Sequence, residues 1–153
     1  RADLYLYQYV GENALMQGFE TTLDWHFYDP WSLAGTLSFV KADLVDKNTP
    51  IPRIPPLNGR TALRYESDGL SFEGAVRFAD KQDRLGEFET PTAGYVVFDF
   101  STQYYFAALN FLHTVSFAIE NITDTEYRQH LNRVKDIMPE PGRNFKLLYK
   151  VYF

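Results

Sequence analysis

The sequence predicts an all-β protein of antiparallel, up-and-down strands that belong to a transmembrane β-barrel. Several long segments alternate between apolar and polar residues, which is the two-residue period of a strand with two unlike faces. The connections between these segments alternate between short and long, as they do at the two rims of an up-and-down barrel. Aromatic residues make up 17% of the chain, with thirteen Phe and eleven Tyr, which is more than a small core needs.

The last segment, residues 143–153, has the clearest alternation. Its apolar face runs to the final residue and consists of Phe145, Leu147, Tyr149, Val151 and Phe153. A soluble domain would let such an end fray. The opposite face is largely polar and consists of Asn144, Lys146, Leu148, Lys150 and Tyr152.

The other predicted strands follow from the same pattern. They cover residues 3–10, 14–28, 31–44, 59–66, 70–81, 94–106 and 113–121, which with the terminal segment makes about eight strands. Short turns are predicted at residues 29–30, 67–69 and 107–112, and long loops at residues 45–58, 82–93 and 122–142. The Pro-rich run at residues 51–56 cannot lie within a paired ladder, which supports the first long loop.

Two environments are compatible with strands of this kind. In a bilayer the apolar faces meet acyl chains, the polar faces line a wet lumen, and a closed ladder satisfies the main-chain groups. A soluble β-sandwich or lipocalin-like barrel would turn the same apolar faces inward. Such an interior would have to pack most of the Phe, Tyr and Trp side chains and leave Ser, Ala and Thr outside. The sequence therefore favours the membrane.

The composition argues against several other classes. A net charge of −5 gives no sign of a nucleic-acid partner. No run of eighteen apolar residues is present, so no transmembrane helix is expected. The chain begins with Arg1 and shows no signal peptide, so we expect a processed protein or a piece of a longer one. Without Cys there is no disulfide framework and no thiolate site, and no metal site or cofactor is assigned.

Two stretches near the end of the chain carry a family resemblance. Residues 120–127 read Glu-Asn-Ile-Thr-Asp-Thr-Glu-Tyr, and residues 139–145 read Pro-Glu-Pro-Gly-Arg-Asn-Phe. With the final Tyr-Phe pair, they resemble the C-terminal box of TonB-dependent outer-membrane receptors. We expect the Arg of this box to pair with carboxylates at the barrel rim. The box positions are Asn121, Asp124, Tyr127, Pro141, Gly142, Arg143 and Phe145.

The resemblance implies a barrel of about 22 strands that is closed by an N-terminal plug. Such a receptor sits in the outer membrane of a Gram-negative cell and imports a scarce ligand, such as an iron chelate, haem, cobalamin or a metal, with energy coupled through TonB. Residues 1–153 would be the C-terminal segment of that barrel, without the plug and the TonB box. The implied partners are outer-membrane lipid, the rest of the barrel and plug, and TonB through the missing N-terminal part. The barrel-assembly machinery would read the signal formed by Phe145, Leu147, Tyr149, Val151 and Phe153.

The third long loop holds the candidate ligand-contacting residues. Its residues 130–136 are similar to a variant found in receptors for metals such as zinc or copper. Because an incoming ligand would first touch this loop, His130 and Asp136 are the candidates. Glu20, Asp24 and His26 share one face of a strand, and we interpret them as part of an ion-paired inner wall.

Two alternative functions stay open from the sequence. An outer-membrane enzyme would use polar groups of the lumen, and Ser116, His113, Asp99 and Ser101 lie on or near inward faces. Because no spacing motif joins them, no catalytic residue is assigned and no enzyme is expected. A self-contained eight-stranded barrel would instead serve as an anchor or adhesion protein.

Overall fold

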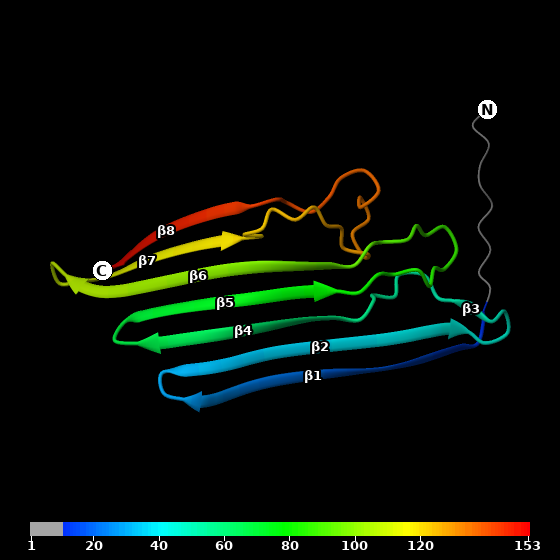
Figure 1. Ribbon diagram of the computed structural model, residues 1–153, viewed down its shortest axis with the longest axis horizontal. Coiled ribbons are helices and arrows are strands. Elements are labelled where there is room, and N and C mark those ends of the chain that lie inside the picture. Colours follow the sequence, from blue (N-terminus) through cyan, green and yellow to red (C-terminus); the bar gives the residue numbers. More distant parts are fainter. Residues whose placement is uncertain (1–10) are drawn as a thin grey trace.

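The computed structural model describes residues 11–153, which form one antiparallel sheet (Figure 1). Seven long strands agree with the predicted ones to within two residues at each end. The strand predicted at residues 3–10 lies outside the described residues. Among residues 11–153, no helix has the length and hydropathy needed to span a membrane. The strands are β1 (Ala14–Tyr28), β2 (Trp31–Leu44), β3 (Thr49–Pro50), β4 (Asn58–Ser67), β5 (Leu70–Ala79), β6 (Tyr95–Ala108), β7 (Phe111–Glu120) and β8 (Asn144–Tyr152).

The strands follow one another in a meander, in the order β1-β2-β4-β5-β6-β7-β8. Short turns lie at one rim and long loops at the other, with the C-terminus at the short-turn rim (Figure 1). Two of the short turns contain paired residues with positive φ, namely Asp68 with Gly69 and Leu109 with Asn110. Such left-handed pairs match the twist of the strands they join. The predicted alternation of connections is confirmed.

The two-residue strand β3 lies within residues 45–58, which the sequence predicts as a loop, and precedes the Pro-rich run at residues 51–56. It pairs with the end of β2, where Pro50 lies opposite Asp43 and Thr49 lies opposite Leu44. Proline cannot donate to a ladder. The main-chain N–H that bonds to β2 is instead that of the next residue, Ile51, which donates to the O of Ala42 at 3.0 Å.

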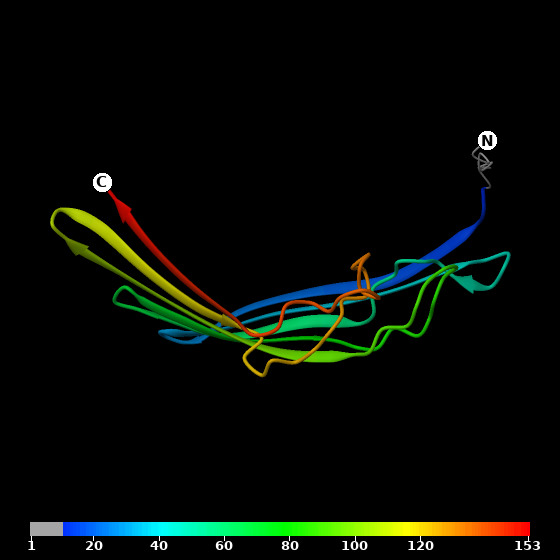
Figure 2. The ribbon, with the colours of Figure 1, turned by 90° about the horizontal axis from the view of Figure 1, so that it is seen from above.

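The described sheet is open. Figure 2 shows it as a curved layer, and no pairing joins β1 to β8 among the described residues. Closure would remove both free edges. The eight-stranded alternative would close through residues 3–10, which lie outside the described residues, so this sheet does not test it.

The register keeps like residues on one side through the whole sheet. On the face that we call the aromatic face, Phe19 lies opposite Phe39, Tyr65 opposite Phe72, and Phe117 opposite Leu147. On the other, the polar face, Arg64 lies opposite Glu73 and Ala118 opposite Lys146. This is the division between two faces that the alternation predicts.

The two faces also differ in what they expose. On the aromatic face, Phe98, Leu147 and Tyr149 are 43%, 76% and 57% exposed. A soluble sandwich would bury these side chains together, so the structure contradicts that alternative. An apolar surface of this extent needs an apolar solvent. On the polar face the buried apolar side chains are small, namely Ala34, Ala42, Ala62, Ala75 and Val97.

The apolar band has the same height on strands that lie far apart. It covers residues 31–39 on β2, 70–78 on β5 and 145–153 at the C-terminus. Each of these segments has nine residues, which extend over about 27 Å along a strand. At a strand tilt of about 40° this corresponds to about 21 Å across the membrane, close to the band of about 25 Å on outer-membrane barrels.

Gly69→Ala is expected to destabilise the turn between β4 and β5, with Gly74→Ala as the matched control. Gly69 has a φ of 81°, and an added Cβ would lie 2.7 Å from the main-chain O of Tyr105. Left-handed strain and this clash together should lower the free energy of unfolding by about 1–3 kcal/mol. An added Cβ on Gly74 meets nothing within 4 Å. Urea unfolding of the refolded receptor compares the two variants, and equal losses would contradict this account of the turn.

Candidate functional site

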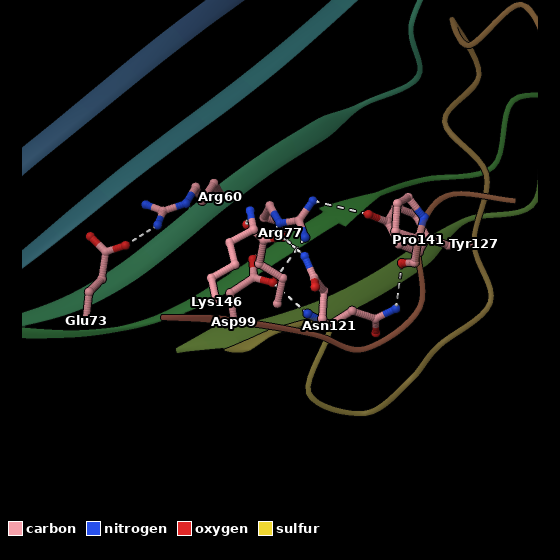
Figure 3. Close-up of polar contacts among 10 residues, drawn as sticks. Arg60, Glu73, Arg77, Asp99, Asn121, Tyr127, Pro141 and Lys146 are labelled. Carbon is pink, nitrogen blue, oxygen red and sulfur yellow. Dashed lines mark hydrogen bonds and ion pairs between the residues drawn. The ribbon is translucent and has the colours of Figure 1, made fainter. Parts of the chain in front are cut away.

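A row of charged side chains crosses the polar face from strand to strand (Figure 3). Arg77 donates to both carboxylate oxygens of Asp99, at 2.5 and 3.1 Å. Glu73 accepts from Arg64 at 2.6 Å and also pairs with Arg60. We call this row the ion ladder, and its four cations and four carboxylates balance. Its members are Asp24, Arg60, Arg64, Glu73, Arg77, Asp99, Glu120 and Lys146.

The strand register explains why the ladder is arranged in this way. Arg60 of β4 lies directly opposite Arg77 of β5, and like charges in that position repel each other. Each guanidinium turns to a carboxylate on a neighbouring position, Arg60 to Glu73 and Arg77 to Asp99. The two-pronged contact of Arg77 with Asp99 also fixes the orientation of both side chains.

The ladder holds the start of the β7–β8 loop. Oδ1 of Asp99 accepts a second bond from the main-chain N–H of Asn121 at 2.9 Å. Arg77 lies 3.4 Å from the hydroxyl of Tyr127 and 5.9 Å from the centre of its ring. The ring of Tyr127 packs against Tyr95 at a centroid distance of 4.5 Å. The loop is therefore attached to the polar wall by both charge and packing.

Asn121 is the centre of the C-terminal box. It is 1% exposed and has a φ of 52°, a left-handed conformation that Asn tolerates better than most residues. Its Oδ1 accepts from the N–H of Thr125 at 2.9 Å, and its Nδ2 donates to the O of Thr125 at 2.9 Å and of Pro141 at 3.3 Å. One side chain thus joins the two halves of the box.

The second half of the box is fixed by Asp124. Its Oδ1 accepts from the main-chain N–H of Arg143 at 2.7 Å. A Cβ on Gly142 would lie 2.7 Å from the same oxygen, so a larger residue there would displace this carboxylate. The N–H of Glu140 donates to the O of Tyr127 at 2.9 Å. The contact of Asp124 with Arg143 is made by the main chain of Arg143, and the side-chain pairing expected for it is not among the ion pairs of the described residues. The box thus joins the end of β7 to the start of β8.

The predicted assembly signal lies along an edge strand. Phe145, Leu147, Tyr149 and Val151 are on the aromatic face of β8, and Phe153 follows the strand with full exposure. One side of β8 pairs with β7, and no described strand pairs with its other side. The signal residues therefore lie on the face and the edge that remain free.

The structure places His130 and Asp136 at a contact between two loops. His130 is 8% exposed, and its Nδ1 lies 2.9 Å from Oγ1 of Thr92 and 3.2 Å from Nζ of Lys135. Asp136 is exposed and accepts from Oγ1 of Thr90 at 2.6 Å. Burial, and then the ammonium of Lys135, hold the pKa of His130 below its ordinary value. His130 is thus enclosed by protein, whereas Asp136 is not.

The charged residues of β1 have the arrangement expected of an inner wall. Asp24 lies 3.8 Å from Arg64 and 3.8 Å from His26. Glu20 lies on the same face of β1, since its register partner is Ser38 of the polar face. Across residues 11–153, no group of three or more His, Cys, Asp or Glu side chains is placed to hold a metal ion.

His113 lies on the aromatic face, which corrects its assignment to the lumen. Its ring stacks between Phe106 and Tyr149, at centroid distances of 5.1 and 5.9 Å. Its Nδ1 lies 2.6 Å from the hydroxyl of Tyr149 and its Nε2 lies 3.0 Å from the O of Ala108. A polar ring is tolerated on this face because both of its nitrogens have partners.

The remaining groups of the enzyme alternative, Asp99, Ser101 and Ser116, lie on the polar face and not with His113. Ser116 donates to Oε1 of Gln103 at 3.1 Å, on the face opposite to His113. Asp99 is occupied by Arg77 and Asn121. The described residues therefore contain no contact between this Ser and this His that would activate a nucleophile.

Comparison with known proteins identifies the family. A family profile described as TonB dependent receptor-like, beta-barrel matches residues 1–122. The chain belongs to this family. Since the box begins at residue 120, the profile and the resemblance of the C-terminal box together extend over the whole sequence.

The fold of this TonB-dependent receptor segment is shared with a solved structure named Copper transporter OprC. The two agree with a TM-score of 0.79 at 23% identity, over 92% of this chain and 24% of that one. The likeness shows the fold, and the chain spans about a quarter of that transporter's length. A search of the curated proteins gives no match.

Asn121→Ala is expected to loosen the box, with Asn144→Ala as its control. The first change removes three hydrogen bonds at a buried site and leaves their partners unpaired, at a cost of about 2–4 kcal/mol. The second removes one long contact of 3.4 Å with Glu120 at a partly exposed site, which should cost less than about 1 kcal/mol. Limited proteolysis of the intact receptor, read at residues 122–142, should show faster cleavage for the first variant alone. Equal cleavage would show that Asn121 does not hold the loop.

Proposed function

We propose that residues 1–153 form the C-terminal part of the wall of an outer-membrane receptor that imports a scarce ligand into the periplasm of a Gram-negative cell. The ligand is a metal, a siderophore complex, haem or a similar compound, and the energy comes through TonB. The observation that carries this proposal is the division of one sheet into a lipid-directed aromatic face and a charge-paired polar face. The family to which the chain belongs supports it.

The aromatic rings near the short-turn rim support the orientation in the membrane. Trp31 lies 5.1 Å from Tyr65, and Tyr65 stacks on Phe72 at 4.7 Å. On β6, Tyr104 stacks on Phe106 at 5.6 Å. Rings with a polar edge accumulate at the headgroup level of outer-membrane barrels, where one end is apolar and the other is wet. In the proposed receptor this rim faces the periplasm, and the long loops face the outside.

The chain's part in import is to form the wall. The ion ladder gives the lumen a hydrated lining whose charged groups already have partners. Such a lining can support a plug and a water-filled passage without retaining a ligand. Ligand selection and coupling to TonB are then tasks of the plug and of the other loops. The fold relative is a copper transporter, which makes copper the first metal to test.

The free edge and face of β8 support a role in assembly. We propose that the barrel-assembly machinery recognises Phe153 and the apolar residues before it. An edge strand with unpaired main-chain groups is a template for pairing with another strand. In the finished receptor the same edge pairs with the first strand of the barrel, which closes the wall.

Phe153→Ser is expected to reduce the amount of folded receptor in the outer membrane, whereas Tyr152→Ser leaves most of it. Phe153 continues the aromatic face, and Tyr152 belongs to the polar face. Burial of the Phe153 ring against the assembly machinery would contribute about 1.5–3 kcal/mol of apolar stabilisation, so its loss should reduce recognition roughly tenfold or more. The measurement is the heat-modifiable band of the full-length receptor in outer-membrane fractions. A similar loss in both variants would contradict a role specific to the aromatic face.

Import itself is tested by deleting the full-length gene. Cells lacking it should accumulate less of one ligand class when given copper, a ferric siderophore or haem at limiting concentration. The intact gene should restore accumulation, and inactivation of TonB should abolish the restored part. Unchanged accumulation of every ligand, or accumulation that does not depend on TonB, would refute the proposal.

A further inference from the structure

Two long loops touch at the rim opposite the short turns. Nζ of Lys135, in the β7–β8 loop, donates to the main-chain O of Thr90 at 2.6 Å and to Oγ1 of Thr92 at 2.8 Å, both in the β5–β6 loop. Lys135 is 8% exposed, so a buried ammonium forms part of the contact. Together with Glu89, His130 and Asp136, these residues make up what we call the loop junction.

The hydrogen bonds determine where the protons of the junction lie. The ammonium of Lys135 can only donate, so Oγ1 of Thr92 accepts from it. The hydroxyl proton of Thr92 is then free to go to Nδ1 of His130, 2.9 Å away. Nδ1 must therefore carry a lone pair, which also lies 3.2 Å from Nζ of Lys135. The neutral ring of His130 has its proton on Nε2.

Nε2 of His130 has no hydrogen-bond partner among the described residues. It is buried, and the carboxylate oxygen Oε1 of Glu89 lies 3.5 Å away. The Glu89 carboxylate is held in place by two main-chain donors, the N–H of Arg53 at 2.6 Å and of Gly86 at 2.9 Å. The carboxylate therefore stays at this distance, where it opposes but does not cancel the effect of burial and of Lys135 on the pKa of His130.

The junction lies beside a cavity of about 490 Å³ on the polar face. The β7–β8 loop contributes Arg128, Gln129, His130 and Leu131 to its lining, and the wall contributes Thr36, Ser38 and Tyr95 among others. The charged groups that share the cavity with His130 are Glu20, Arg60, Arg77, Asp80 and Arg128. The loop therefore covers a space that opens onto the lumen.

We propose that the loop junction is a pH-sensitive latch, which holds the two loops together as a lid over this cavity while His130 is neutral and releases them when His130 gains a proton. A proton on Nδ1 removes the acceptor of the Thr92 hydroxyl and places an N–H beside the ammonium of Lys135. Both changes oppose the closed arrangement.

The direction of the pH response follows from the same contacts. Burial and the ammonium of Lys135 lower the pKa of His130, and the Glu89 carboxylate opposes them. A group whose pKa is lower in the folded arrangement stabilises that arrangement fully above its ordinary pKa, about 6.5 for His. The stabilisation is lost as the pH falls through the lowered pKa.

The latch is tested by a distance between the loops in the intact receptor. Spin labels at Glu87→Cys and Ile137→Cys, two exposed positions, report on the β5–β6 and β7–β8 loops. Pulsed electron paramagnetic resonance gives the label distances over a series from about pH 8 to about pH 4.5, which brackets the titration of His. No transported ligand is required, so the result is independent of the import proposal.

The labelled receptor should show one narrow distance distribution at high pH and lose it at the acidic end. His130→Asn keeps an acceptor for Thr92 but does not titrate, so its distribution should stay narrow throughout. His26→Asn removes an exposed His of the wall and should behave as the unmodified receptor does. A distribution that never broadens in the unmodified receptor, or that broadens equally in the His130→Asn receptor, would overturn the latch.

If His130→Asn opens the junction at every pH, a second variant still tests the proposal. Glu89→Gln removes the carboxylate that favours the imidazolium. The broadening should then begin at a lower pH than in the unmodified receptor. An unchanged midpoint, or one moved to higher pH, would refute the proposal.

Discussion

The division of this sheet into two faces depends on an antiparallel ladder of main-chain hydrogen bonds. Lipid offers no hydrogen-bonding partner to a peptide group, so neighbouring strands must satisfy one another. The ladder also fixes the register, and a slip of one residue would exchange the aromatic and polar faces of a strand. In the described sheet, the one register shift among the long pairings lies between His26 and Tyr28, beside a short turn. The apolar band is consequently continuous from β1 to β8.

The longest interruption of this ladder is the loop between β7 and β8. Here the main chain leaves the sheet, and side chains provide hydrogen-bond partners for its N–H and C=O groups. Asn121 bonds to Thr125 and Pro141, and Asp124 bonds to Arg143. The Arg77–Asp99 pair attaches the same region to the wall. This explains in physical terms why the box combines an amide, a carboxylate, a glycine and an aromatic ring at fixed spacing.

Alternation alone was sufficient to predict the strands and their faces, because the parity of a position decides its side whatever the register. It was not sufficient to predict pairs such as Arg77 with Asp99, since that requires the register between β5 and β6. His113 shows a different limit. The alternation of the strand places His113 on the same face as Val115 and Phe117, whereas its polar ring suggests the lumen. The structure follows the alternation, because Tyr149 and Ala108 provide partners for both ring nitrogens.

The candidate ligand residues show a third limit. A His in a long polar loop looks exposed in the sequence, and nothing local indicates that Lys135 and Thr92 enclose it. The other partner in that contact, Thr92, lies in a different loop, 38 positions earlier in the sequence. The box was recognised, by contrast, because its residues lie within one short stretch of sequence. Tertiary contacts of separate loops leave no comparable trace.

The balance of the ion ladder has a consequence for what passes along it. A lining with an excess of one sign would concentrate counter-ions and repel ions of its own sign over about a Debye length. The four cations of the ion ladder are paired with four carboxylates, so the ladder itself adds no net charge to the lining. A net field along this stretch must therefore come from charged groups outside the ladder, such as Glu20.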